Sequence, residues 1–187
     1  MNTYPNPHYP HTIENGHGEK LTMVRYVEDG QGGIIECTNE VSPKSGPPMH
    51  VHWKQEESLT VTEGRMGVEI MGQPPQFFGP GETATFTRGT YHRFWNAGET
   101  TLKCTGWVKP ALNFEYFLTN IYDSIRESGN GRPAPFESAF LLKRYKTEFD
   151  MADIPAFVKK VIFPITLTLG KLQGKHKKFA NAPEPIK

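Results

Sequence analysis

The residues of this chain best suited to chemistry stand between His50 and Glu57. In an extended strand, side chains at positions i and i+2 point to the same face, so His50 and His52 project together. Glu57 follows five residues after His52 and begins a run in which it shares a face with Leu59 and Val61. Two imidazoles and a carboxylate on neighbouring strands are donors typical of a site for a divalent metal ion.

The choice between the adjacent Glu56 and Glu57 depends on the apolar face of the same run. Leu59 and Val61 alternate with polar residues such as Ser58. The apolar face must be the inside of a β-domain, because polar side chains are costly to bury without partners. We therefore predict that Glu57 points inward and that Glu56 points outward.

A third imidazole, His92, lies on another expected strand, where Phe94 and Asn96 share its side. Three nitrogen donors and one oxygen donor suit Fe, Mn, Ni, Co, Cu or Zn and leave room for water or substrate. A calcium site would need more oxygen donors. The pattern alone does not bring His92 to the other three residues, because that requires a fold.

The region from residue 20 to 109 has the residue composition and turn signals of a β-domain. Short runs rich in β-branched and aromatic residues alternate with turn signals such as Asp29-Gly30 and Ala97-Gly98. We expect strands at Leu21–Val27, Gly33–Asn39, Met49–Trp53, Leu59–Glu63, Met66–Met71, Thr83–Thr87, His92–Asn96 and Thr101–Lys109. Eight short strands at this spacing predict a closed barrel or a two-sheet jelly roll.

The spacing of the apolar residues along the chain changes after Pro110. Apolar residues from Phe114 to Ile125 recur at three- and four-residue steps, which predicts an amphipathic helix ending near Gly129. A second helix is expected from Pro135, because proline is compatible with a first helical turn. A third covers residues 156–172 and is expected to break or kink at Pro164. The chain thus divides into a flexible segment (1–20), a barrel (21–109) and a helical extension packed on the barrel (110–187).

Composition limits the function classes. A chain of 187 residues with 36% hydrophobic and 22% charged residues suits one globular domain, and its net charge of +1 provides no field to attract nucleic acid. Cys37 and Cys104 each stand in an apolar run, so we expect buried, reduced thiols. The N-terminus does not read as a secretory signal, and the longest apolar run, Val161–Leu169, is far below the roughly 20 residues of a membrane span. A cytoplasmic location is expected.

The spacing of the candidate ligands resembles that of the cupin superfamily. Its first motif runs Gly, five residues, His-x-His, three or four residues, Glu, six residues, Gly; here His50, His52, Glu57 and Gly64 match. The leading glycine differs, since position 44 is lysine and the nearby glycine is Gly46. The second motif runs Gly, five residues, Pro-x-Gly, two residues, His, three residues, Asn; here Gly81, Gly89, His92 and Asn96 match, with Thr87 in place of the proline.

The resemblance covers residues 20–109 and implies a fold and a ligand set. The implied fold is an all-β cupin β-barrel, a double-stranded β-helix or jelly roll, here with a C-terminal α-helical extension. The implied ligands of one divalent metal ion are His50, His52, Glu57 and His92, which would otherwise be polar residues retained in an apolar interior. Gly64 and Gly81 are expected to serve turns with positive φ.

The same resemblance does not identify one activity. Cupins include dioxygenases, isomerases, epimerases, decarboxylases, lyases, storage proteins and sugar sensors. We expect a mononuclear metal enzyme acting on a small organic molecule, a dioxygenase or related oxidoreductase, in which Glu57 also acts as a catalytic base. The alternatives are a non-catalytic cupin that binds a small, carbohydrate-type molecule, and a metal-dependent isomerase or lyase.

For several other residues the sequence supports a less specific interpretation. Leu59, Val61, Phe94 and Trp107 could line a substrate pocket above the metal, and each could equally be ordinary barrel core. Gln55 and Tyr91 flank the ligands in sequence and could donate hydrogen bonds to them, but we expect these two residues at the surface or in turns. Trp53 and Trp95 alternate with inward residues and are expected to face outward. They could lie in a subunit contact or under the helical extension.

The helical extension is expected to bury its apolar residues on the barrel or across a dimer, because isolated helices of this length are marginal in water. Cupins commonly pair through barrel edges, so the resemblance implies a homodimer in which the extension contributes to, or covers, the contact. Six lysines accompany the apolar residues of segment 159–178. Such a pattern also occurs in helices that lie on anionic membrane surfaces. We expect packing of this segment and no membrane contact.

Overall fold

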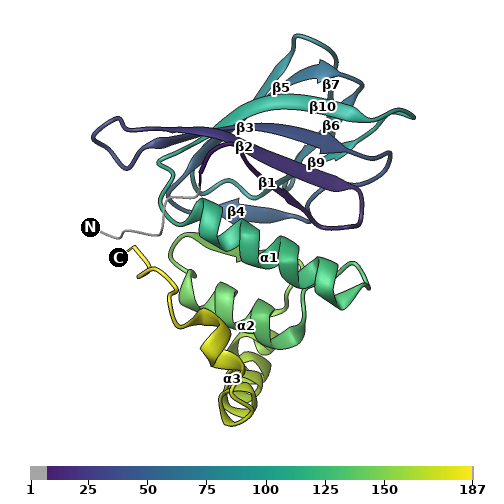
Figure 1. Ribbon diagram of the computed structural model, residues 1–187. Helices are drawn as coiled ribbons and strands as arrows, with labels where there is room; N and C mark the ends of the chain where they lie inside the picture. Colours follow the sequence, from purple (N-terminus) through teal and green to yellow (C-terminus); the bar gives the residue numbers. More distant parts are fainter. Residues whose placement is uncertain (1–7, 187) are drawn as a thin grey trace.

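The structure is a computed structural model that describes residues 8–186. Residues 1–7, part of the segment expected to be flexible, lie outside the described residues. A β-barrel of two antiparallel sheets occupies one half of the molecule, and the helices lie together beneath it (Figure 1). The expected fold, an all-β barrel with C-terminal helices, is confirmed.

The eight expected strands are all present. They are β2 (Glu19–Val27), β3 (Ile34–Val41), β4 (His50–His52), β5 (Glu56–Glu63), β6 (Met66–Ile70), β8 (Thr83–Phe86), β9 (His92–Asn96) and β10 (Leu102–Lys109). Three further short strands are β1 (His11–Glu14), β7 (Gln76–Phe78) and β11 (Phe149–Met151). The six-stranded sheet has the order β1-β2-β3-β10-β5-β8, and the five-stranded sheet has the order β11-β4-β9-β6-β7. Gly64 and Gly81 adopt φ values of 88° and 86°, as expected of their turns.

The described part of the N-terminal segment is ordered in strands, which corrects the expectation for residues 8–20. Strand β1 pairs with β2, and Ile13 of β1 is buried. The Nδ1 atom of His11 lies 2.7 Å from Oε1 of Glu115 in the first helix. The segment has little apolar content of its own, so its order comes from pairing with β2 and from contacts to the helical extension.

The helical extension has the expected helices and one strand that was not expected. The helical segments are α1 (Phe114–Ser128), α2 (Pro135–Arg144), a π-helical turn η1 (Val158–Ile162), α3 (Phe163–Leu172) and a 3₁₀ turn η2 (Lys175–Phe179). The irregularity expected at Pro164 takes the form of η1, in which the N–H of Phe163 bonds to the carbonyl of Val158. A widened turn accommodates a proline that has no N–H to donate.

Strand β11 links the extension to the barrel sheet. It pairs with β4, so that Phe149 lies opposite His52 and Met151 lies opposite His50. The boundary expected at residue 109 therefore divides the sequence, but one sheet contains strands from both sides of it. A three-residue strand with one buried side chain has no period that a sequence pattern can detect.

Two hydrophobic clusters stabilise the molecule. The barrel core is built from Val41, Leu59, Val61, Met66, Val68, Ala84, Phe86, Phe94, Leu102 and Cys104. The shared core joins the barrel to the extension and contains Ile13, Leu21, Met23, Ile35, Cys37, Val108, Ala111, Phe114, Tyr116, Phe117, Phe136, Ala139, Leu141, Leu142, Tyr145, Phe149, Phe163 and Phe179. Cys37 and Cys104 are buried free thiols, as expected.

The last helix packs on its neighbour rather than on the barrel. The Cα of Gly170 approaches the ring of Phe136 so closely that a Cβ at position 170 would overlap it. Phe163 is buried on the same side of α3, whereas Ile165 and Leu169 are 53% and 54% exposed. Of the two expected packing sites for this segment, its own barrel does not bury these two residues, and packing on a partner subunit stays a prediction. Within residues 8–186, every helix falls short of the length and apolar character that a membrane crossing requires.

Candidate metal centre

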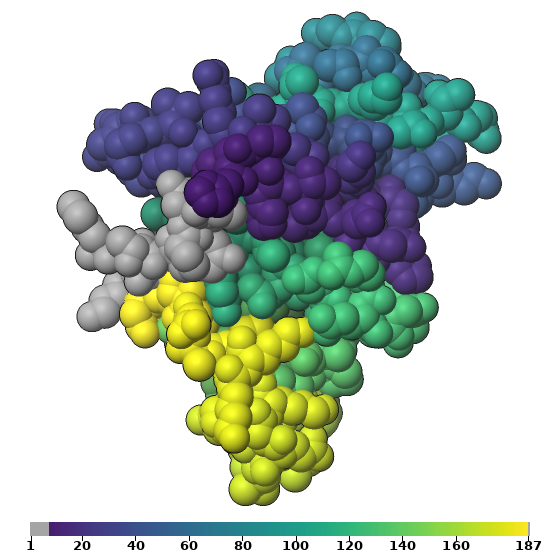
Figure 2. All heavy atoms as spheres, viewed as in Figure 1, coloured from purple at the N-terminus to yellow at the C-terminus, as the bar shows by residue number. Residues whose placement is uncertain are grey.

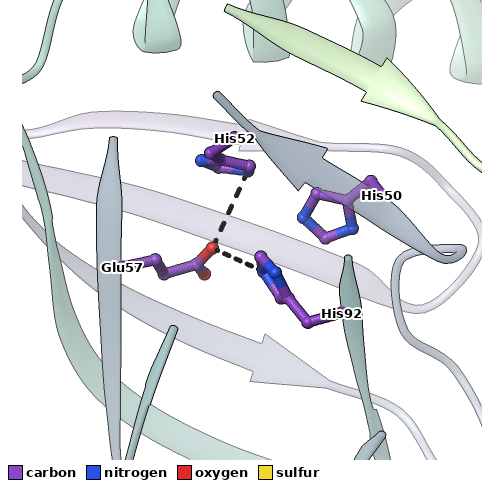
Figure 3. Close-up of side chains that lie close together, drawn as sticks. All are labelled: His50, His52, Glu57 and His92. Atoms are coloured by element: carbon purple, nitrogen blue, oxygen red, sulfur yellow. Dashed lines mark hydrogen bonds and ion pairs between the residues drawn. The ribbon is translucent and has the colours of Figure 1, made fainter. Parts of the chain in front are cut away.

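Three strands of the two sheets bring the four expected ligands together. His50 and His52 come from β4, Glu57 from β5 and His92 from β9, and their side chains point toward one another (Figure 3). His50 and His92 are directly opposite in the β4–β9 pair. One donor atom from each of the four residues lies within 4.8 Å of the others. The barrel thus supplies the contact with His92 that the sequence pattern could not.

The strand register selects Glu57 over Glu56, as expected. Glu57 is 8% exposed and faces the imidazoles. Glu56 points the other way, and its carboxylate lies 3.6 Å from Arg88 and 3.9 Å from Lys109 on the outer surface. The alternation of β5 therefore places one carboxylate inside the barrel and its neighbour in solvent-accessible ion pairs.

Backbone carbonyls orient two of the three rings. The Nδ1 atom of His50 lies 2.8 Å from the carbonyl oxygen of Pro48, and Nδ1 of His92 lies 2.9 Å from that of Thr90. A carbonyl oxygen can only accept, so Nδ1 donates a hydrogen bond in each ring and Nε2 is the nitrogen that faces the cluster. Hydrogen bonds of this kind hold metal-binding histidines in position.

Burial and mutual contacts shift the pKa values of His50, His52 and Glu57. Burial lowers the pKa of His50 to about 4 and that of His52 to about 3, so both rings are neutral at pH 7. Burial acts to raise the pKa of Glu57, but the hydrogen bond to His92 and the electrostatic interactions with the three histidines outweigh it and lower that pKa to about 2. At neutral pH the site therefore combines the neutral rings of His50 and His52 with the ionised carboxylate of Glu57.

This donor set fits a divalent cation. Nε2 of His92 lies 3.4 Å from Oε2 of Glu57, and Nε2 of His52 lies 3.8 Å from the same oxygen. Two ligands about 2.1 Å from one ion are separated by roughly 3 to 4 Å, so both distances suit a shared ion. The Nδ1 atom of His52 is buried with no hydrogen-bond partner. A buried carboxylate among neutral donors is stabilised by a cation between them.

Aromatic rings enclose the site from both cores. The ring of Phe86 stacks on His92 with centroids 3.9 Å apart. Phe114 and Phe149 of the helical extension lie 5.9 and 5.4 Å from the ring of His52. Sequence reasoning missed these two neighbours, because the position of Phe149 depends on strand β11 and Phe114 reads as one residue of a helical stripe.

A buried polar network anchors the extension beneath the ligand strand. Glu148 is fully buried, and its carboxyl oxygens accept hydrogen bonds from the backbone N–H and side-chain amide of Asn113 and from the N–H of Ile186. The amide of Gln55 lies 3.5 Å from the same carboxyl group. Gln55 is 1% exposed, so its expected surface position is wrong. Tyr91 is partly buried, and its hydroxyl donates to Asp150.

The residues expected to line a pocket lie near a very small cavity. Leu59, Val61 and Phe94 are buried in the barrel core. A cavity of about 10 Å³ beside Glu57, close to the minimum for one water molecule, has Leu59, Trp107 and Phe114 among its lining residues. The ring of Trp107 lies 4.6 Å from Nζ of Lys109, which neighbours the outward Glu56.

The two tryptophans expected on the outer surface are found there. Trp53 is 40% exposed, and its ring contacts Tyr91. Trp95 covers Gly67 and meets Phe77 edge to face. Neither residue belongs to the shared core.

Comparison with known proteins links the barrel to one family. Residues 38–108 match the family model described as "Cupin domain". "Probable oxidoreductase virH" of Hypocrea virens is 32% identical over 97 residues, which are 49% of this chain and 44% of that protein. "Oxidoreductase iacF" of Pestalotiopsis fici is 30% identical over 102 residues, which are 50% of each protein. The chain spans about half the length of these curated relatives.

Solved structures also overlap with part of the chain. KdgF from a Halomonas species is 15% identical, with a TM-score of 0.45, and the match covers 52% of this chain and 86% of that one. A recombinant oxalate oxidase in complex with glycolate is 20% identical, with a TM-score of 0.41, and the match covers 49% and 51% of the two chains.

Proposed function

We propose that this chain, in which residues 38–108 form a cupin domain, is a mononuclear metal-dependent enzyme that acts on a small organic molecule as a dioxygenase or related oxidoreductase. The observation that carries the proposal is the cluster of His50, His52, Glu57 and His92, whose donor atoms lie within 4.8 Å of one another. The names of the two curated relatives support oxidoreductase chemistry.

The chain's own groups have distinct roles in this proposal. The Nε2 atoms of the three histidines and the Glu57 carboxylate would hold the ion, and Pro48 and Thr90 keep two of the rings oriented through their carbonyl groups. The ion would supply Lewis acidity or electron transfer to a bound substrate. Glu57 would also accept a proton from the substrate, since its carboxylate is ionised and buried beside the rings.

The surroundings of the ligands restrict the substrate. The rings of Phe86, Phe114 and Phe149 exclude water from one side of the cluster. His50 is the least buried of the four ligands, so a substrate would approach past its ring. Because the cavity beside Glu57 has room for about one water molecule, a substrate must be small or must displace the side chain of Phe114.

The metal site is tested by elemental analysis of purified variants. His50→Ala and His92→Ala should lower metal content steeply, because each removes one of four ligands, while circular dichroism shows an intact barrel. Glu57→Gln should also weaken metal binding, and the neighbouring Glu56→Gln is the matched control that should leave it nearly unchanged. Full metal occupancy in both histidine variants would refute the site, and a reversed result for the two glutamates would contradict the strand register.

The oxidoreductase assignment needs a separate measurement. Oxygen consumption should appear when candidate substrates are added to protein loaded with Fe(II), Mn or Ni, and the His92→Ala variant should lose it. A protein that retains its metal and binds a small molecule without consuming oxygen would exclude the dioxygenase. Turnover of the substrate without oxygen would instead indicate a metal-dependent isomerase or lyase.

A further inference from the structure

The final helical segment leaves a large apolar surface without a partner in this chain. Phe157, Val161, Ile162, Ile165, Leu169 and Leu172 are 40% to 82% exposed and form what we call the outer face. They account for six of the ten large hydrophobic side chains found exposed in the described residues. The opposite side of α3, with Phe163 and Gly170, is already occupied by α2. The exposure is therefore a property of one helix face and not of a loosely packed segment.

The position of this face suits contact with an extended surface. Segment 156–172 lies at the tip of the molecule farthest from the barrel and projects beyond the other helices (Figure 2). A protruding, convex stripe can approach a flat partner without interference from the rest of the protein. The metal ligands lie on strands β4, β5 and β9 of the barrel and not in this segment.

The charged residues of the same segment are all of one sign. Between residues 154 and 183 the sequence has six lysines and no aspartate or glutamate. The chain's net charge of +1 therefore combines a net charge of +6 in this segment with a net charge of −5 in the rest of the chain. Lys160 and Lys171 are exposed and stand beside outer-face residues, and Lys175 and Lys177 follow directly after α3. Basic side chains thus flank the apolar stripe at both ends.

We propose that the outer face, together with these lysines, docks the protein on an anionic lipid bilayer. A helix with an apolar face and a lysine-rich border lies in the plane of a membrane, with its apolar side chains among the acyl chains and its lysines at the headgroups. Anionic lipids attract such lysines and oppose their removal. The expectation of no membrane contact rested on packing of these apolar residues on the barrel or on a partner subunit, and within this chain they are exposed.

A second copy of the chain is the alternative occupant. A symmetric contact between two outer faces would bring two segments of six lysines together, which opposes association. A head-to-tail contact with a more acidic surface would form open chains rather than a closed dimer. Charge therefore favours the anionic bilayer.

Cosedimentation of the full-length, metal-loaded protein with vesicles tests the proposal. Binding is expected to vesicles that contain phosphatidylglycerol together with phosphatidylcholine, to be absent with phosphatidylcholine alone, and to weaken as salt is raised. The variant Ile165→Asp with Leu169→Asp should abolish binding. The variant Lys171→Glu with Lys175→Glu should weaken it by about tenfold or more. The matched control is Met71→Asp, which changes a side chain 51% exposed on the barrel and should bind like the parent protein.

Three outcomes would overturn the proposal. The first is no binding to anionic vesicles, and the second is equal binding by the Ile165→Asp, Leu169→Asp variant. The third is a dimer of the parent protein, seen by light scattering, that becomes a monomer in this variant, which would identify the outer face as a subunit contact. Because the substituted side chains are exposed, the variants should keep the metal content and melting temperature of the parent protein. These two measurements then exclude misfolding as the cause of lost binding.

Discussion

The barrel core and the shared core differ in where their residues come from. All ten members of the barrel core lie between Val41 and Cys104, on strands of the two barrel sheets. Of the eighteen members of the shared core, six come from strands β1, β2, β3 and β10, and twelve come from residues after Lys109. The end of the barrel that faces the helices therefore has no complete core of its own.

The metal ligands lie at the boundary between these cores. His92 stacks on Phe86 of the barrel core, and His52 contacts Phe114 and Phe149 of the shared core. The extension is thus one wall of the site and not an appendage to it. The outer face of α3 belongs to neither core, which separates the extension into a structural part and a part available to a partner.

Truncation after Lys109 should have the largest effect. It removes twelve of the eighteen residues of the shared core and strand β11, and it exposes apolar side chains such as Met23 and Ile35. We expect the truncated chain to aggregate or to lose its cooperative unfolding transition, as measured by sedimentation and thermal denaturation. A soluble truncated protein with the metal content of the intact chain would show that the barrel core suffices and that the comparison is wrong.

Phe149→Ala should show that one residue of the shared core supports the metal site as well as the stability of the fold. Removing this buried ring should cost roughly 3–5 kcal/mol of unfolding free energy, measured by chemical denaturation. It should also weaken metal binding, because the ring of His52 loses a neighbour 5.4 Å away. Phe163→Ala is the matched control, since Phe163 lies in the shared core on α3 and should destabilise the protein without changing metal affinity. Equal metal affinities in the two variants would contradict the assigned role of Phe149.

Glu19→Gln should have the smallest effect, at the contact between the barrel and α1. Burial raises the pKa of Glu19 above its ordinary value of 4.5, although hydrogen bonds from Tyr122 and Asn15 oppose the shift. A raised pKa in the folded state means that ionisation of Glu19 destabilises the fold as the pH rises above 4.5. The glutamine variant should therefore melt at a higher temperature than the parent at pH 7, and the difference should disappear below about pH 4. A lower melting temperature at pH 7 would show that the carboxylate stabilises the contact.

The sequence by itself determined the strands and the direction of their side chains. A strand has a period of two, so the alternation of Leu59 and Val61 with polar residues was enough to direct Glu57 inward. The helices α1 and α2 were equally evident, because apolar residues at three- and four-residue steps must share one buried face. These features depend on local geometry, and local geometry can be read along the chain.

The tertiary structure alone decided which distant residues meet. It placed Phe149 against His52, enclosed Glu148 in a polar network and ordered His11 against Glu115, because each contact joins segments far apart in sequence. It also decided which apolar residues of α3 remain exposed. Phe163 and Leu169 are equally apolar in the sequence, and only the position of α2 covers one and leaves the other in solvent.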